Sequence, residues 1–116
     1  MQLPSTIYEP GDVVAVRFQF REHDRPKPRP AVIISVSEYQ ESRIDAVMIA
    51  VSTRTDKTYF GDCMIQDWKD AGLVEGSKAK GYFRTIEKSK IRQRIGRLSD
   101  LDKTRLQQSI RHMLGL

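Results

Sequence analysis

Side chains suited to phosphate chemistry lie next to the apolar runs of this chain. Arg29 stands between Pro28 and Pro30, directly before the apolar run 31–35. Proline restricts its own φ and biases the residue before it toward extended backbone, so Arg29 is expected at the mouth of a strand. A guanidinium is always charged and presents a fork of N–H donors, which suits it to binding a phosphate or an oxyanion. The plainer alternative is an arginine that forms a surface salt bridge.

Hydroxyl, carboxylate and imidazole groups accompany this arginine. Ser52, Thr53 and Arg54 end the apolar run 44–52, and the loop before Arg29 contains three further polar residues, Glu22, His23 and Asp24. If neighbouring strands bring these segments to one rim, the chemistry they support is phosphoryl transfer without a metal. A carboxylate or imidazole takes a proton, the guanidinium stabilises phosphate charge, and the hydroxyls orient the oxygens. On RNA, the attacking group would be the 2′-OH of the substrate.

Each of these residues also has a structural interpretation. Glu22 and Asp24 fit solvated loop charges, and His23 fits a surface position in the same loop. Ser52 and Thr53 fit hydroxyls that satisfy backbone groups at a strand end. The residue types alone leave both interpretations open.

Other chemistries have little support in the sequence. His23 and His112 lie far apart and share no metal-ligand spacing with Cys63 or with a pair of carboxylates. A lone cysteine in an expected strand is usually a small core residue. No phosphate-binding glycine pattern is present. We therefore expect neither a metal nor a cofactor.

Length and composition bound the class of protein. The chain has 116 residues, which predicts one domain, 1–116, with a single core. Its formal net charge of +5 suits a polyanionic partner. The first residues lack the basic and apolar regions of a signal peptide, and the longest apolar run is 46–51. With one cysteine, these features predict a cytoplasmic protein.

A basic run in the second half has two interpretations. The residues of this run either bind phosphates or form a charged face that is exposed to solvent. Its members are Lys78, Lys80, Arg84, Lys88, Lys90, Arg92, Arg94 and Arg97. Similarly, Trp68 is either a base-stacking residue or a packing anchor beside Ala71 and Leu73.

The elements that would position these residues are mostly strands. Runs rich in valine and isoleucine predict strands at 12–20, 31–37 and 44–52, with weaker candidates at 58–65 and 80–85. Residues 67–73 predict one helical turn stopped at Gly72, and Gly96 marks another turn.

The end of the chain changes to a helical period. Ser99 is a predicted N-cap with Asp102 three residues later, and Gly115 follows the last apolar position. Several short strands with one terminal helix favour a mainly β (α+β) fold, in which a small closed or half-closed barrel carries a C-terminal α-helix.

Five segments in order resemble the PemK/MazF family of growth-inhibiting toxins, in its PemK-like branch. They are Pro-Gly-Asp-Val-Val at 10–14, Arg-Pro-Ala-Val-Ile-Ile-Ser at 29–35, Ala-Val-Ser-Thr at 50–53, Asp-Trp-Lys-Asp-Ala-Gly-Leu at 67–73, and Gly-Arg-Leu-Ser with a later Asp at 96–102. Together they extend over nearly the whole chain.

The resemblance implies an SH3-like β-barrel with a C-terminal helix that works as a homodimer. It also implies the toxin of a type II toxin-antitoxin system, a metal-independent, sequence-selective endoribonuclease. Its substrate would be single-stranded RNA, above all mRNA, and a cognate acidic antitoxin would restrain it. A second hypothesis is a non-catalytic module of the same fold that binds nucleic acid or the antitoxin.

The resemblance also assigns roles to residues. Arg29 matches the catalytic arginine of the family, Ser52 takes the place of its catalytic threonine, and Glu22 matches an acidic loop residue. Substrate binding is expected of six further residues, Thr53, His23, Arg54, Lys78, Lys80 and Arg84.

Overall fold

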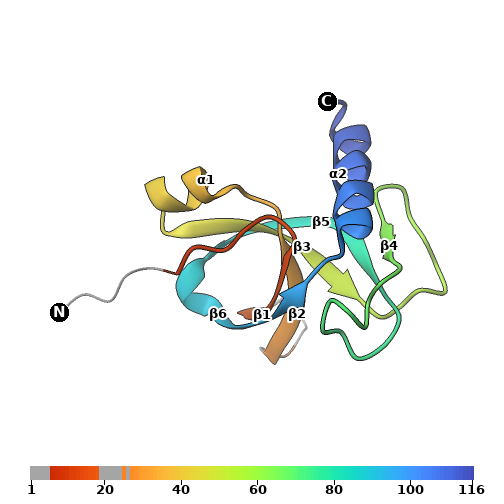
Figure 1. Ribbon diagram of the computed structural model, residues 1–116, viewed down its shortest axis with the longest axis horizontal. Coiled ribbons are helices and arrows are strands. Elements are labelled where there is room, and N and C mark those ends of the chain that lie inside the picture. Colours follow the sequence, from red (N-terminus) through yellow and green to blue (C-terminus); the bar gives the residue numbers. More distant parts are fainter. Residues whose placement is uncertain (1–5, 19–24, 26) are drawn as a thin grey trace.

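A curled antiparallel sheet of six strands forms the body of the protein (Figure 1). The computed structural model describes residues 6–18, 25 and 27–116. The strands are β1 (Asp12–Phe18), β2 (Lys27–Ile33), β3 (Asp45–Ser52), β4 (Cys63–Ile65), β5 (Ser77–Glu87) and β6 (Ile91–Arg97). Their order across the sheet is β4-β5-β3-β2-β1-β6. This arrangement confirms the predicted mainly β barrel-like fold with a C-terminal helix.

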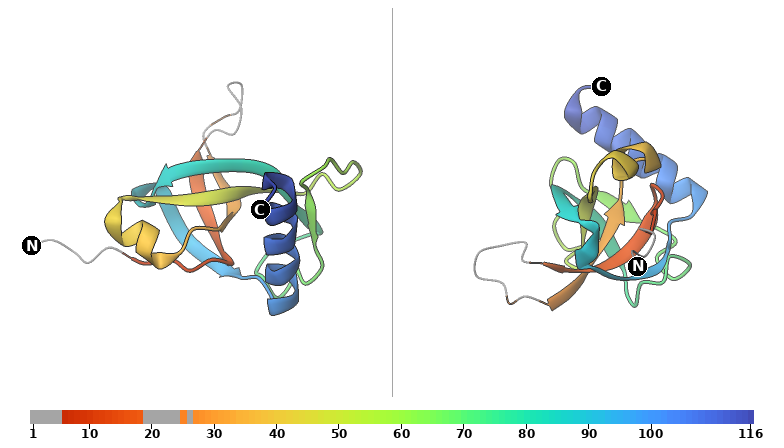
Figure 2. Two further views of the ribbon diagram at one scale, coloured as in Figure 1. Left: turned by 90° about the horizontal axis from the view of Figure 1, so that it is seen from above. Right: turned by 90° about the vertical axis from the view of Figure 1, so that its left-hand side faces the viewer.

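Helices flank the sheet at its two ends. The helix α1 (Ser37–Ser42) lies at one end and α2 (Asp100–Leu114) at the other, as Figures 1 and 2 both show. A short 3-10 helix, η1 (Lys88–Lys90), joins β5 to β6. Within the described residues, no helix is long and apolar enough to cross a membrane.

The sheet buries a different apolar cluster on each face, because side chains alternate along a strand. One cluster includes Leu106 of α2 together with Val13, Val32, Ile49, Val51, Ile65, Ala71, Ala79 and Leu98. The other consists of Val14, Val16, Ala31, Ile33, Ala46, Met48 and Ile86. The face of this second cluster therefore points away from α2.

The strand β2 begins earlier than predicted and contains both prolines. It pairs with β1 from Lys27 to Val32, whereas its pairing with β3 starts only at Ala31. Proline has no N–H to donate, so it is tolerated where one side of a strand has no partner. The predicted continuation to Ser37 is wrong, because α1 starts there.

The remaining strand predictions differ mainly in their bounds. β3 matches its prediction closely, and so does β1 over the described residues, since 19–20 of the predicted 12–20 lie outside them. β5 is longer than the predicted 80–85, and only Cys63–Ile65 of the predicted 58–65 is a strand. Neither β6 nor α1 was predicted. The predicted helical turn at 67–73 is a set of hydrogen-bonded turns, with Ala71 N–H donating to Asp67 O (3.2 Å).

The predicted turn at Gly96 is wrong, since this glycine lies inside β6. A Cβ atom at position 96 would lie 2.3 Å from the carbonyl oxygen of Ala71, so the absence of a side chain allows two backbone segments to touch. Gly72 itself has a φ of 84°, which matches the predicted stop of the turn.

The two caps of the C-terminal helix are confirmed. The Ser99 hydroxyl accepts a hydrogen bond from the Asp102 N–H (3.2 Å), and Gly115 is left-handed. Asp102 is buried, and its carboxylate accepts from the N–H groups of Gln66 (3.0 Å) and Asp67 (2.7 Å). The start of α2 is thereby bonded to the segment that follows β4.

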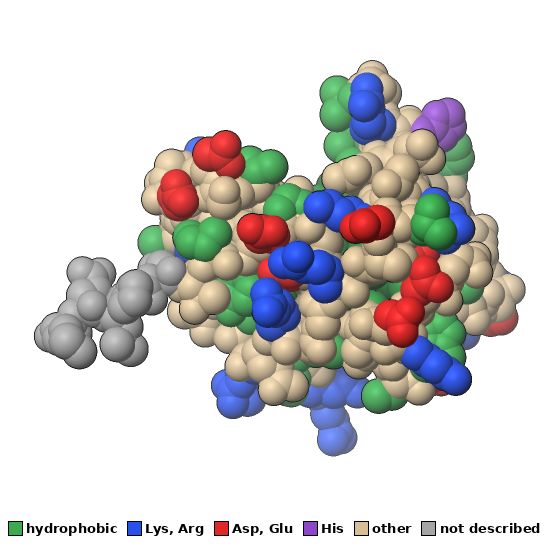
Figure 3. Space-filling model, in the orientation of Figure 1, with side chains coloured by type: hydrophobic (Ala, Val, Ile, Leu, Met, Phe, Trp, Pro, Cys, Tyr) green, Lys and Arg blue, Asp and Glu red, His purple; other side chains and the backbone are tan. Residues whose placement is uncertain are grey.

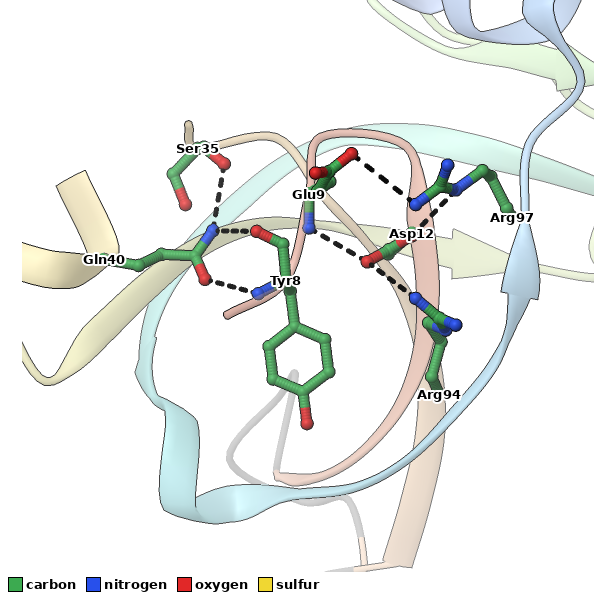
Figure 4. Close-up of polar contacts among 7 residues, drawn as sticks. All are labelled: Tyr8, Glu9, Asp12, Ser35, Gln40, Arg94 and Arg97. Atoms are coloured by element: carbon green, nitrogen blue, oxygen red, sulfur yellow. Dashed lines mark hydrogen bonds and ion pairs between the residues drawn. The ribbon is translucent and has the colours of Figure 1, made fainter. Parts of the chain in front are cut away.

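Buried polar side chains hold the segment before β1 in place (Figure 4). The Gln40 side chain accepts from Tyr8 N–H (2.9 Å) and donates to Tyr8 O (2.6 Å). Asp12 is fully buried and accepts from Arg97 Nε (3.1 Å), with Arg94 3.6 Å from its other oxygen. These contacts tie β1 to α1 and to β6.

Candidate active site

A cleft of about 480 Å³ opens where β2 and β3 separate. We call it the Arg29 cleft. Its lining residues are Lys27, Pro28, Arg29, Pro30, Ala50, Val51, Ser52, Thr53, Arg54, Lys80 and Tyr82. The structure therefore brings together five of the predicted site residues, Arg29, Ser52, Thr53, Arg54 and Lys80.

The sheet register explains why Arg29 and Ser52 line the same cleft. Ala31 pairs with Ala50, and the same register continued by two residues places Arg29 across from Ser52. Ser52 pairs in turn with Lys78 of β5. Directly opposed residues of antiparallel strands share a face, so these three side chains leave the sheet on the face of the second cluster, away from α2.

The Ser52 hydroxyl is already part of a local turn. Its oxygen accepts a hydrogen bond from the Arg54 N–H at 3.1 Å. This is the backbone-satisfying role of the structural interpretation. A hydroxyl that accepts one bond still has its own proton to donate, so both roles are compatible. Thr53 and Arg54 are exposed beside it.

Lys78 is buried beside the cleft. Its side chain is 3% exposed, and its ammonium lies 2.8 Å from an Asp62 carboxylate oxygen and donates to the carbonyl of Lys57. Burial raises the pKa of Asp62, but hydrogen bonds from Lys78, Tyr59 N–H and Gly81 N–H outweigh it and hold that pKa below its ordinary 3.8. Lys78 thus anchors the loop 53–62 to β5.

The basic run is divided among several local contacts. Arg94 and Arg97 contact Asp12, while Lys88 donates to the carbonyls of Thr6 (3.3 Å) and Gln40 (3.4 Å). In the view of Figure 3, basic and acidic side chains alternate across the middle of the molecule, and basic side chains protrude at its lower edge. Three members of the run, Lys88, Arg94 and Arg97, are therefore engaged in contacts within the protein.

Tyr82 of the cleft has no clear signal in the sequence, whereas Trp68 stands out there. Tyr82 lines the cleft, and the Arg84 guanidinium lies 4.2 Å from the centre of its ring. Alternation along β5 with Lys80 is the signal that could have found it. Trp68 packs against the first cluster, as the packing-anchor interpretation expects.

Two predicted site residues and the single cysteine remain to be placed. Glu22 and His23, like Asp24, lie outside the described residues. Cys63 is partly buried, and burial, with a smaller contribution from Asp102, raises the pKa of its thiol. In the described part of the chain, no three histidine, cysteine, aspartate or glutamate side chains are grouped so that they could hold a metal ion.

A comparison with protein families decides the classification. Residues 9–114 match the family described as PemK-like, MazF-like toxin of type II toxin-antitoxin system. The chain belongs to this toxin family. Among curated proteins, no significant relative of this PemK/MazF-like chain was found.

Solved MazF-like structures share the fold. A MazF from Deinococcus radiodurans has a TM-score of 0.75 at 17% identity, covering 97% of this chain and 100% of that one. An endoribonuclease from a mycobacterial species has a TM-score of 0.72 at 16% identity, covering 96% and 94%. A mycobacterial endoribonuclease in complex with its cognate antitoxin has a TM-score of 0.74 at 16% identity, covering 94% and 96%.

Proposed function

We propose that this PemK/MazF-like toxin is a cytoplasmic endoribonuclease that cleaves single-stranded RNA, above all mRNA, at selected sequences and without a metal. The observation that carries the proposal is the Arg29 cleft, which a half-buried arginine of β2 and a serine hydroxyl of β3 both line. Two similar structures are those of endoribonucleases, which supports the same reaction.

The reaction proceeds through the 2′-OH of the substrate. The 2′-oxygen attacks the adjacent phosphorus as a base removes its proton, and the bond from phosphorus to the 5′-oxygen of the next nucleotide breaks as that oxygen takes a proton from water. The products are a 2′,3′-cyclic phosphate and a 5′-hydroxyl. Arg29 binds the phosphate oxygens and stabilises the added charge, and Ser52 donates its proton to one of them. Glu22 is the proposed base, and His23 follows it in the sequence.

The serine hydroxyl provides the first test. Purified protein incubated with single-stranded RNA in EDTA should release fragments that end in a cyclic phosphate. Ser52→Ala should slow this cleavage about tenfold or more, because one hydrogen bond to a charged phosphate is lost. Ser52→Thr should cleave at least as fast as the wild type, since the β-methyl restricts χ1.

The controls separate catalysis from folding. Ser109→Ala, a serine on α2 outside the cleft, should leave the rate unchanged. Cleavage that requires Mg²⁺ would contradict the metal-free reaction. A wild type that binds RNA without cutting it would instead support the non-catalytic module.

We further propose that the chain forms a homodimer and that an acidic antitoxin segment binds the same basic surface as RNA. The antitoxin complex among the similar structures supports such a partner. Exposed apolar side chains, including Ile44 (68%) and Leu116 (79%), would be buried if a second copy of the chain packed against them.

Competition between the two ligands tests this surface. Adding a stoichiometric antitoxin should release bound RNA, and raising the salt concentration should weaken both complexes. Light scattering should give a mass of twice 13.4 kDa. A monomer at micromolar concentration would contradict the dimer, and a ternary complex with RNA would contradict the shared surface.

A further inference from the structure

A second, smaller pocket adjoins the Arg29 cleft. We call it the loop pocket; its volume is about 180 Å³, and its lining residues are Ser52, Arg54, Asp56, Lys57, Tyr59, Lys78 and Lys80. Three of these residues, Ser52, Arg54 and Lys80, also line the Arg29 cleft. A strand of RNA whose phosphate lies in the cleft would therefore place a neighbouring nucleotide at the loop pocket. The pocket has room for one base.

The walls of the loop pocket are built before any ligand arrives. Asp62 accepts from Tyr59 N–H (3.0 Å) and Gly81 N–H (3.0 Å), and Lys78 bonds both Asp62 and the carbonyl of Lys57. These bonds fix both sides of the segment 57–62 to β5. A preformed pocket loses little conformational entropy on binding, which favours selective recognition.

An aromatic ring and a carboxylate give the pocket its chemistry. Tyr59 is 64% exposed, and the Lys78 ammonium lies 5.7 Å from the centre of its ring, so the residue is accessible for stacking. Asp56 is exposed and is the one carboxylate among the lining residues, and within the described residues it makes no hydrogen bond or ion pair. Single-stranded RNA is read by this combination of stacking and hydrogen bonds to base edges.

A carboxylate at position 56 would distinguish the four bases by the donors and acceptors on their Watson–Crick edges. Guanine presents an N1–H and a 2-amino N–H side by side, which match the two oxygens of one carboxylate. Adenine and cytosine place an acceptor nitrogen next to their amino group, and uracil has a single N–H between two carbonyls; each therefore puts a repelled acceptor against Asp56. Arg54, Lys57 and Lys80 supply positive charge for the flanking phosphates.

We propose that the loop pocket binds one guanine of the RNA substrate, with Asp56 accepting from its Watson–Crick edge and Tyr59 stacking on its ring. Asp56 is then a specificity-determining residue, separate from the catalytic pair Arg29 and Ser52. This inference rests on the proposed cleavage of RNA but uses a different readout.

Binding of uncleavable RNA tests the proposal. The probes are 2′-O-methyl uracil hexamers in which one position is uracil, guanine or inosine, which lacks the 2-amino group. The wild type should bind the guanine probe about tenfold more tightly than the other two, as measured by fluorescence anisotropy. Asp56→Ala should bind all three with similar affinity, and Tyr59→Ala should weaken all three.

A matched control removes the effect of net charge. Asp70 is exposed in the turn after Trp68, so Asp70→Ala deletes one negative charge and should keep the guanine preference. Equal binding of the guanine and inosine probes by the wild type would overturn the proposal, as would a guanine preference that survives in Asp56→Ala. Failure of the nuclease function is recognised separately, by uncut RNA with a free 2′-OH.

Discussion

Replacing Arg29 by lysine should lower kcat/KM for RNA cleavage about 10²–10³-fold, although the positive charge is retained. Arg29 lies in the cleft across from Ser52, where a phosphate with two oxygens would need two directed donors. A guanidinium offers them in one rigid plane, whereas an ammonium is a compact point charge at the end of a flexible stem. Initial rates on a short single-stranded RNA measure the effect.

The matched control for this substitution is Arg92→Lys on β6. Arg92 is exposed and lies outside the lining of the cleft, so its replacement should leave the rate and the melting temperature unchanged. Arg29→Lys should also melt near the wild-type temperature. Wild-type cleavage by Arg29→Lys would mean that the arginine contributes charge alone, and the forked contact would have to be abandoned.

The second large effect is expected on stability. Lys78→Met should lower the free energy of unfolding at pH 7 by about 3–5 kcal/mol, because it leaves the Asp62 carboxylate buried without its cation. The side chains of Lys78 and Asp62 are 3% and 4% exposed, so water cannot replace the lost partner. Urea unfolding measures the change, and Lys90→Met, at an exposed position of η1, is the control.

This penalty should depend on pH in a defined direction. The folded-state pKa of Asp62 lies below 3.8, so its ionised form stabilises the wild type above that value, and the contribution is lost as the pH falls through the folded pKa. The difference between wild type and Lys78→Met should therefore narrow in acid. Adding Asp62→Asn should restore part of the loss at pH 7. A constant difference from pH 7 to pH 3 would show that the ion pair is not its source.

Residue types were sufficient to predict that Arg29 and Ser52 lie at one rim of the sheet. Two prolines around Arg29 and an apolar run that ends at Ser52 place both residues at strand ends, and the antiparallel register of β2 and β3 then brings them together. The face on which each of these side chains lies follows from the alternation along its own strand, so it can be predicted from the local sequence. For the same reason, the caps of α2 at Ser99 and Gly115 could be read from the sequence.

Features that depend on distant partners could not be predicted. Nothing in the sequence distinguishes Lys78 from the other basic residues. Its burial follows from its contact with Asp62, which the sequence does not reveal. Gly96 has no local signal to separate a turn from the close approach of Ala71. The helix α1 is short and has no side-chain cap, so only its packing against the sheet, through the buried Gln40, explains it.

The ion pair between Lys78 and Asp62 has a consequence for how target choice can change in this fold. It fixes the base of the loop 53–62, while Asp56 and the exposed ring of Tyr59 stand beyond it. The anchor uses the backbone N–H of Tyr59 and the carbonyl of Lys57, so side-chain substitutions at Asp56 and Tyr59 leave these backbone bonds and the proposed pair Arg29 and Ser52 in place. The residues of this loop can therefore be exchanged independently of the barrel. Grafting residues 54–59 onto a related toxin that retains the lysine and aspartate of the anchor should transfer the base preference without changes to the strands.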